Sequence, residues 1–246
     1  MTTNYDDISD DYVKATDHPI KKYCESFTFI KILGDVKAKS VLDVACGEGY
    51  YTRLIKQQGA AHIVGLDISQ KMIDLAEYRE KTVPLGIQYQ IGDIVQLGQI
   101  GQFDRVTAIF LFPYAATKQV LVAMFQAIYD NLKPGGKLVA ITVDPKLTED
   151  HLPVFGQYGV ILEAEAGLHD GTLITATVDN PDGSSFRMQT FYWEEVTYQN
   201  VIDQVGFRTI RWHPIQVSEA GLKAYGAAYW QAYATKPYSI VLECDK

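Results

Sequence analysis

One short segment, residues 40–50, limits what this chain can fold into more than any other. It reads Ser-Val-Leu-Asp-Val-Ala-Cys-Gly-Glu-Gly-Tyr, a near-continuous apolar run followed by two glycines. Such a run is typical of a strand buried on both faces of a parallel sheet. Residues 50–58 then follow a helical pattern. A strand, a glycine turn and a helix in succession let the backbone approach a ligand closely and offer it free N–H groups.

Length and charge indicate one globular domain and disfavour binding to nucleic acid or to an anionic membrane. The chain has 246 residues, of which 47% are hydrophobic, and this suits one α/β domain over residues 1–246 with a small insertion. Acidic residues number 30 against 22 basic ones, for a net charge of -8, and Lys and Arg form no stripe. We therefore expect neither nucleic acid nor an anionic membrane as a partner.

The cysteines and the termini predict a cytoplasmic protein. Cys24, Cys46 and Cys244 are far apart and odd in number, so they suggest neither a zinc site nor a disulfide framework, and we expect no metal. Residues 1–11 are acidic and polar, which is unlike a secretory signal. The longest apolar run, residues 106–112, is too short to span a bilayer.

Two classes of cofactor are bound at turns of this kind. The dinucleotide fingerprint G-x-G-x-x-G fails here because Thr52 stands at its third position. The pattern Asp43-x-x-x-Gly47-x-Gly49 instead resembles the first motif of the class I S-adenosylmethionine (SAM) methyltransferases. In that family the turn wraps the amino-acid end of the cofactor. The resemblance implies cofactor contacts from Asp43, Ala45, Cys46, Gly47 and Gly49.

A second motif follows at the next predicted strand, residues 61–67. The strand ends in Asp67, 18 residues past Gly49, where a carboxylate can accept hydrogen bonds from both ribose hydroxyls. Ser69 is a typical N-cap for a helix that we expect to reach residue 79. The run Gly-Leu-Asp-Ile-Ser-x-x-Met at residues 65–72 resembles the second motif of the family. It implies that Asp67, Ile68 and Met72 contact the cofactor.

The next two predicted strands, residues 87–91 and 103–110, end in further candidates. Gly92, Asp93 and Ile94 follow the first of them and resemble the turn that contacts adenine in the family. Phe110 ends the second strand, and ligands of open α/β sheets bind at the carboxyl ends of strands. We therefore expect Phe110 beside the cofactor and Phe112 and Tyr114 on the substrate side.

The remaining pattern alternates strands with helices to the end of the chain. We expect helices at 120–132, 194–204 and 221–234, a turn at 133–136, and strands at 137–143, 207–213 and 238–244. The family resemblance implies an α/β, Rossmann-like seven-stranded sheet of order 3-2-1-4-5-7-6, with strand 7 antiparallel and helices on both faces.

Two segments lie outside this core. Residues 1–39 predict an N-terminal helical cap that also serves as a lid. Residues 145–192 carry a β-hairpin around the turn at 180–183, and an insertion after strand five would form a roof over the substrate. We expect substrate contacts from Tyr5, Phe112, Tyr114, Phe155, Tyr158 and Tyr192, and a cofactor contact from Tyr12.

The chemistry of SAM demands mainly positioning. Its sulfonium has a neutral leaving group, so a nucleophile needs to lie in line behind the methyl carbon. A base is required only where the acceptor must lose a proton. The sequence identifies no general base; the weak candidates are Tyr12, His151 and Tyr158, together with His18 and His169.

A narrower resemblance concerns the acceptor. Residues 40–47, 59–69 and 138–145 resemble the toxoflavin-biosynthesis type of methyltransferase, which methylates ring nitrogens of a small heterocycle. This implies methyl transfer from SAM, leaving S-adenosylhomocysteine, to nitrogen or oxygen of a small aromatic or heterocyclic metabolite, by a monomer or homodimer. The alternatives are an NAD-dependent oxidoreductase, a non-catalytic SAM-binding protein, and a protein or RNA methyltransferase. The acidic balance argues against RNA, and the predicted roof argues against a bulky substrate.

Overall fold

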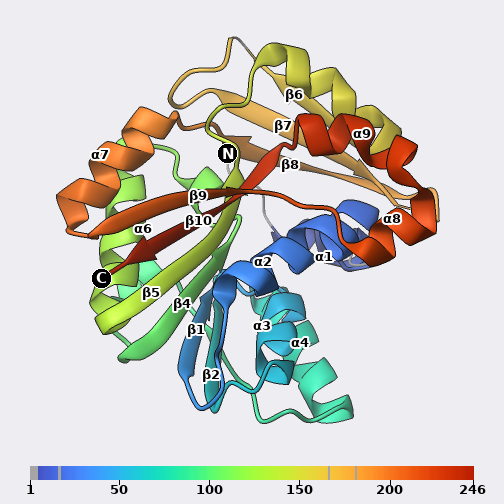
Figure 1. Cartoon of the computed structure of the whole chain (residues 1–246). Coiled ribbons are helices and arrows are strands. Elements are labelled where there is room, and N and C mark those ends of the chain that lie inside the picture. The colour runs from blue at the N-terminus through green and yellow to red at the C-terminus, as the bar shows by residue number, and fades with distance from the viewer. Residues whose placement is uncertain (1–4, 16–17, 166, 181) are drawn as a thin grey trace.

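Two β-sheets organise the computed structural model, which describes residues 5–15, 18–165, 167–180 and 182–246 (Figure 1). The main sheet has the order β3-β2-β1-β4-β5-β10-β9, and the second has the order β6-β7-β8. In the main sheet β10 runs antiparallel to both of its neighbours, while the other pairs are parallel. The predicted fold class is confirmed. Because β6 to β8 belong to the second sheet, β9 and β10 are the sixth and seventh strands of the main one.

The main sheet consists of β1 (Ser40–Val44), β2 (His62–Asp67), β3 (Gln88–Ile91), β4 (Phe103–Ile109), β5 (Leu132–Val143), β9 (Thr209–Pro214) and β10 (Ser239–Asp245). The second sheet consists of β6 (Val160–Ala164), β7 (Leu173–Asp179) and β8 (Ser185–Phe191). The α-helices are α1 (Tyr5–Lys14), α2 (Ser26–Leu33), α3 (Tyr50–Gln57), α4 (Gln70–Thr82), α5 (Ile94–Leu97), α6 (Lys118–Asn131), α7 (Glu195–Val205), α8 (Glu219–Tyr225) and α9 (Ala227–Thr235). Three tighter or wider helical segments are η2 (Lys21–Glu25), η3 (Phe112–Tyr114) and η4 (Glu149–Tyr158).

Three predicted elements differ from the structure. The hairpin of β7 and β8 is present, but β6 joins it as a third strand; its Val-Ile-Leu run has no polar alternation to reveal a strand. The strand expected at 137–143 begins at Leu132, with a register shift opposite Phe103 and Arg105. The helix expected at 221–234 is divided into α8 and α9, because Gly226 adopts φ +81°.

Two hydrophobic clusters fill the two faces of the main sheet. One lies under α6 and α7, and in it Phe112 stacks on Phe125 with ring centroids 4.0 Å apart. The other lies under α2 and α3 and extends to η4 and α9. Figure 1 shows these helices on opposite sides of the sheet. The sheet is thus covered on both faces, as a parallel sheet requires.

Phe112 supplies a test of this packing. We expect Phe112→Ala to lower the free energy of unfolding by about 3–5 kcal/mol, since it leaves a cavity against Phe125. Phe27, which is 39% exposed on α2, is the matched control, and Phe27→Ala should cost about 0.5 kcal/mol or less. Urea unfolding of both variants measures the difference. Equal losses would contradict a core position for Phe112.

Candidate functional site

The carboxylate of Asp67 joins the end of β2 to the glycine turn after β1. Its Oδ2 accepts a hydrogen bond from the Gly47 N–H at 2.7 Å, and its Oδ1 accepts from the Ser69 N–H at 2.9 Å. Burial raises the pKa of Asp67, and these backbone donors oppose the rise. Each carboxylate oxygen has a second lone pair, so Asp67 retains capacity to accept from two further donors.

The two glycines of the turn have different reasons to be glycine. Gly47 adopts φ +55°, and a Cβ placed on it would meet no atom within 4 Å, so its backbone faces open space. Gly49 adopts φ +84° as the N-cap of α3, and its Cβ would collide with the ring and hydroxyl of Tyr89. The first glycine therefore leaves room for a ligand, and the second leaves room for the protein's own packing.

An outer cavity opens beside this turn, at the carboxyl ends of β1, β2 and β4. Asp67 and Asp93 line it together with apolar side chains that include Leu66, Met72 and Met124. Asp93 is the N-cap of α5 and accepts from the Val95 N–H at 2.9 Å. The predicted cofactor residues that line the outer cavity are Tyr12, Ala45, Gly47, Asp67, Ile68, Met72, Gly92, Asp93, Ile94 and Phe110.

Asp43 lies in a smaller turn pocket next to the outer cavity, not in the outer cavity itself. It is fully buried, and its two oxygens accept from the hydroxyls of Thr52 at 2.6 Å and Thr107 at 2.7 Å. Burial raises the pKa of Asp43 to about 6. Cys46 also lines this turn pocket. Asp67 and Asp93 thus line the outer cavity, whereas Asp43 lines the adjoining turn pocket and ties β1 to α3 and β4 behind the turn.

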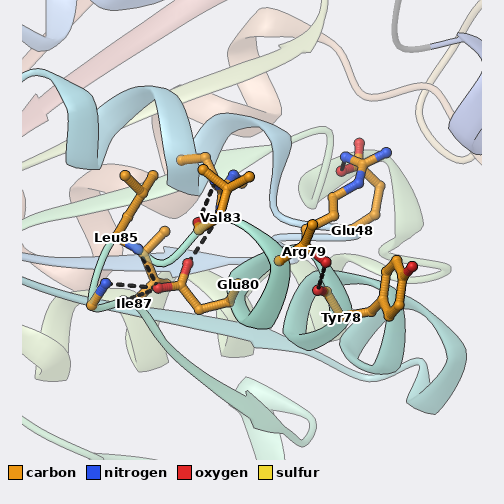
Figure 2. A network of polar contacts seen from close by, with 10 residues as sticks. Glu48, Tyr78, Arg79, Glu80, Val83, Leu85 and Ile87 are labelled. Atoms are coloured by element: carbon orange, nitrogen blue, oxygen red, sulfur yellow. Dashed lines mark hydrogen bonds and ion pairs between the residues drawn. The ribbon is translucent and has the colours of Figure 1, made fainter.

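A network of ion pairs holds the turn against α4. Glu48, which is buried in the turn, pairs with Arg79 of α4 (Figure 2). The Lys21 Nζ lies 3.9 Å from the Glu48 carboxylate. The next residue of α4, Glu80, accepts from the backbone N–H groups that lead into β3 and pairs with Arg53 at 2.8 Å. Figure 2 shows that these contacts join the turn, α4 and the start of β3. The backbone around the outer cavity is therefore fixed from behind.

An inner cavity of about 990 Å³, counting its open mouth, lies between the main sheet and the second sheet. The ends of β4 and β5 form one wall through Ile109 and Val143, and the second sheet forms the opposite wall. The predicted roof therefore covers a cavity. The outer and inner cavities share the walls Tyr5, Tyr12, Ile109, Phe110 and Tyr114, which we call the neck.

Helix α1 closes the neck from one side. The hydroxyls of Tyr5 and Tyr114 contact each other, and the Tyr12 ring meets Tyr5 edge-on at 5.3 Å. Asp6 fastens the same helix to α4, because its Oδ1 accepts from the Ser69 hydroxyl at 2.5 Å. Burial raises the pKa of Tyr5 and Tyr12, and it raises that of Tyr114 to about 12. The neck is therefore lined by neutral phenols at physiological pH.

Several residues expected at the substrate lie elsewhere. Phe112 is in the core, as described above, and Phe155 is fully buried with its ring 5.2 Å from that of Tyr238. Tyr158 donates to the Tyr229 carbonyl at 2.7 Å, and Tyr192 donates to the Pro145 carbonyl at 2.5 Å. None of these four side chains lines the inner cavity. An aromatic residue in a predicted roof packs as readily into the core as against a ligand.

The candidate general bases also divide into residues that line the inner cavity and residues that do not. His151 accepts from the Thr148 N–H at 3.3 Å in η4, and His169 contacts the Thr172 hydroxyl; neither lines the inner cavity. His18 does line it, and its Nε2 lies 2.6 Å from the Tyr158 carbonyl. Burial lowers the pKa of His18, so its imidazole is neutral at pH 7. Tyr12 lines both cavities, whereas Tyr158 does not.

The sequence interpretation missed two charged residues of the inner cavity, Lys21 and Glu25. They stand at the two ends of η2, a π-helical turn that precedes α2. No periodicity predicts a π-helix, which is rare and often marks functional sites. The available signal was Glu25 itself, a single acid in the largely apolar run 23–33.

Comparisons with known proteins agree with this geometry. Residues 41–136 match the family model described as a methyltransferase domain. The ubiquinone biosynthesis O-methyltransferase of Coxiella burnetii is 32% identical over 136 residues, which cover 55% of this chain and 56% of that protein. The chain thus spans little more than half the length of that relative. The N-demethylindolmycin N-methyltransferase of Streptomyces griseus is 25% identical over 177 residues, 70% of this chain and 71% of that protein.

Solved structures extend the similarity to nearly the whole chain. An S-adenosylmethionine-dependent methyltransferase from Mesorhizobium loti superposes with a TM-score of 0.65 at 17% identity, covering 94% of this chain and 99% of that one. Similarity at this identity shows the fold. The chain therefore shares the fold of that methyltransferase structure, and its residues 41–136 match the methyltransferase-domain model.

The buried carboxyl of Asp43 predicts an unusual pH dependence. The folded protein holds this proton more tightly than the unfolded chain, because the pKa rises from 3.8 to about 6. The stability contributed by Asp43 is therefore present below about pH 4 and lost as pH rises through about 6. The asparagine of Asp43→Asn cannot titrate, so the variant should lose none of this stability. The free energy of unfolding of Asp43→Asn, measured relative to wild type at the same pH, should therefore increase by roughly 1–3 kcal/mol between about pH 4 and 7.

Urea unfolding at several pH values measures this difference. Asp104→Asn is the control, because the pKa of Asp104 is lowered from 3.8 to about 2, so both its folded and its unfolded forms are ionised above about pH 5. Its difference from wild type should stay nearly constant above about pH 5. A constant difference for Asp43→Asn as well would mean that Asp43 titrates normally.

Proposed function

We propose that this protein is an enzyme that transfers the methyl group of SAM to nitrogen or oxygen of a small aromatic or heterocyclic metabolite. The proposal starts from its SAM-dependent methyltransferase fold and from the match of residues 41–136 to a methyltransferase domain. The observation that carries the proposal is the neck. It joins a cavity lined by two carboxylates and a side-chain-free turn to a largely apolar cavity between the two sheets. A methyl donor on one side of the neck and an acceptor on the other would meet there.

The residues present fit SAM. Asp67 retains lone pairs for the two ribose hydroxyls, and its fixation by Gly47 and Ser69 orients them. Asp93 and the apolar walls of the outer cavity suit adenine, and the turn pocket beside Gly47 suits the amino-acid end. When bound, SAM supplies an activated methyl group on a sulfonium. The turn of residues 45–49 would hold that end of the molecule.

The chain's own side chains position the reactants, exclude water and surround the reacting atoms with aromatic rings. The neck is built from tyrosine, phenylalanine and isoleucine, which exclude water and tolerate a cation at their ring faces. Tyr5, Tyr12 and Tyr114 stay protonated at neutral pH because burial raises their pKa values. They therefore serve as neutral hydrogen-bonding groups and not as bases. We assign no general base.

The alternatives fare less well. A non-catalytic SAM-binding protein would need no cavity behind the neck, and the inner cavity favours an enzyme. Its enclosure between two sheets favours a small acceptor over a protein or an RNA. An NAD-dependent oxidoreductase is disfavoured by Thr52, whose hydroxyl donates to Asp43 and which stands where the fingerprint has its third glycine.

We propose a cytoplasmic protein, monomer or homodimer, with no nucleic-acid or membrane partner. Among the described helices, none combines the length and apolar character needed to cross a bilayer.

Asp67 provides the direct test of the cofactor. Asp67→Ala should weaken binding of S-adenosylhomocysteine by about 1–3 kcal/mol, because two hydroxyls lose their acceptor. Asp74→Ala, on the outer surface of α4, is the control and should bind like wild type. Isothermal titration measures both, with NAD titrated into wild type in parallel. Unchanged affinity in Asp67→Ala would remove this residue from the site, and a preference for NAD would end the proposal.

The two glycines give a matched pair of variants. Gly47→Ala places a methyl group in the open space of the turn, so we expect a loss of S-adenosylhomocysteine affinity of about tenfold or more at a modest cost in stability. Gly49→Ala forces its methyl group into Tyr89, so it should lower the free energy of unfolding by a further 1–3 kcal/mol or so. Titration and urea unfolding of both variants separate the two effects. Equal behaviour would show that both glycines serve the fold alone.

A further inference from the structure

Glu25 is a buried carboxylate in the wall of an apolar cavity. Its side chain is 3% exposed and lines the inner cavity. The Ser239 hydroxyl donates to its Oε1 at 2.9 Å, and the Tyr238 hydroxyl is a second hydrogen-bonding neighbour. Among the ion pairs of the described residues, none includes Glu25. A carboxylate buried without a cation is costly, so its position requires a reason.

A second polar group lines the same cavity. The Tyr51 side chain is 6% exposed, and its hydroxyl is buried without a hydrogen bond of normal geometry in the described structure. Tyr51 comes from α3 and Glu25 from the end of η2, so two independent elements bring polar atoms to this cavity. Buried polar groups are normally satisfied, and a ligand is one means of satisfying them.

The π-turn gives its two charged residues different positions. Lys21 lines both the inner cavity and the turn pocket. Glu25 lines the inner cavity but neither the outer cavity nor the turn pocket. The Lys21 Nζ already lies 3.9 Å from Glu48 and 4.4 Å from the centre of the Tyr50 ring. Burial raises the pKa of Glu25, and the positive charge of Lys21 is among the influences that oppose the rise. No ion pair among the described residues includes Glu25, and its side chain does not line the outer cavity.

The wall formed by the second sheet is largely apolar. The second sheet contributes Val160, Leu162, Ile174, Val178, Phe186 and Met188. These side chains present hydrocarbon and one aromatic ring, with a thioether that suits contact with an aromatic ligand. The cavity therefore faces one apolar wall, and its anionic group, Glu25, lies on η2 with Lys21 at the other end of that segment.

We propose that the acceptor has an apolar, aromatic body and carries a protonated amine, which Glu25 binds as an ammonium–carboxylate pair. This rests on the proposed function, because it names the acceptor class of the same enzyme. A charge-assisted hydrogen bond in a dry cavity is stronger than a neutral one and would compensate the burial of Glu25. Glu25 does not line the outer cavity or the neck, where the methyl group would be transferred. The amine that Glu25 binds would therefore lie away from the atom that receives the methyl group.

The test uses the protein saturated with S-adenosylhomocysteine and three matched pairs of probes. Each pair shares an aromatic body and differs in an ammonium or a hydroxyl: benzylamine and benzyl alcohol, phenethylamine and phenethyl alcohol, tryptamine and tryptophol. In at least one pair the amine should bind about tenfold more tightly than the alcohol by isothermal titration. Glu25→Gln, which keeps size and shape, should abolish that preference. Glu163→Gln, an exposed position on β6, should retain it.

The outcomes separate this inference from the proposed function. Normal S-adenosylhomocysteine binding with no amine preference in any pair overturns the acceptor class and leaves the methyltransferase proposal intact. Failure to bind S-adenosylhomocysteine overturns the function first. An amine preference that persists in a folded Glu25→Gln variant overturns the role of Glu25. Should that variant fail to fold, the comparison of amine and alcohol in wild type still decides the class.

Discussion

The hydrogen bonds from Thr52 and Thr107 to Asp43 are the interaction on which the architecture of the site depends. They join the end of β1 to α3 on one side and to β4 on the other, directly behind the glycine turn. A fully buried carboxylate is costly, and it is tolerated here because two hydroxyls satisfy its oxygens. Once this anchor is in place, the backbone at Gly47 is held in the conformation that the Asp67 carboxylate requires.

Local chemistry made the first half of the chain readable. Ser69 caps α4 by accepting from the Met72 N–H, and Asp67 ends a buried strand; both follow from residue types and short spacings. The sheet order then follows from the alternation of strands and helices together with the family resemblance. Asp43 shows the limit of this reasoning. Its motif places it near the cofactor, but only the positions of Thr52 and Thr107 in space show that the protein itself uses both of its oxygens.

The acceptor side could not be read in the same way, because long-range packing decides it. Phe112 and Tyr114 are two residues apart on η3, yet one stacks on Phe125 in the core and the other contacts Tyr5 in the neck. Nothing in the residue types separates them. The wall formed by β6 was missed because its apolar run lacks alternation, and the π-turn that carries Lys21 and Glu25 has no sequence signature. Predicting these positions requires the register of the second sheet against the first.

The distribution of ionisable groups along the two cavities has a chemical consequence. The outer cavity holds Asp67 and Asp93, and the inner cavity holds Glu25 and Lys21, whose Nζ lies 5.5 Å from the centre of the Tyr12 ring. The neck itself holds phenols with raised pKa values. Such a neck cannot remove a proton from an alcohol at neutral pH. An acceptor atom that already has a free lone pair, such as a ring nitrogen, needs no such help. Methyl transfer to an alcohol would therefore need a base from outside the neck, and the shape and charge of the inner cavity are left to select among acceptors.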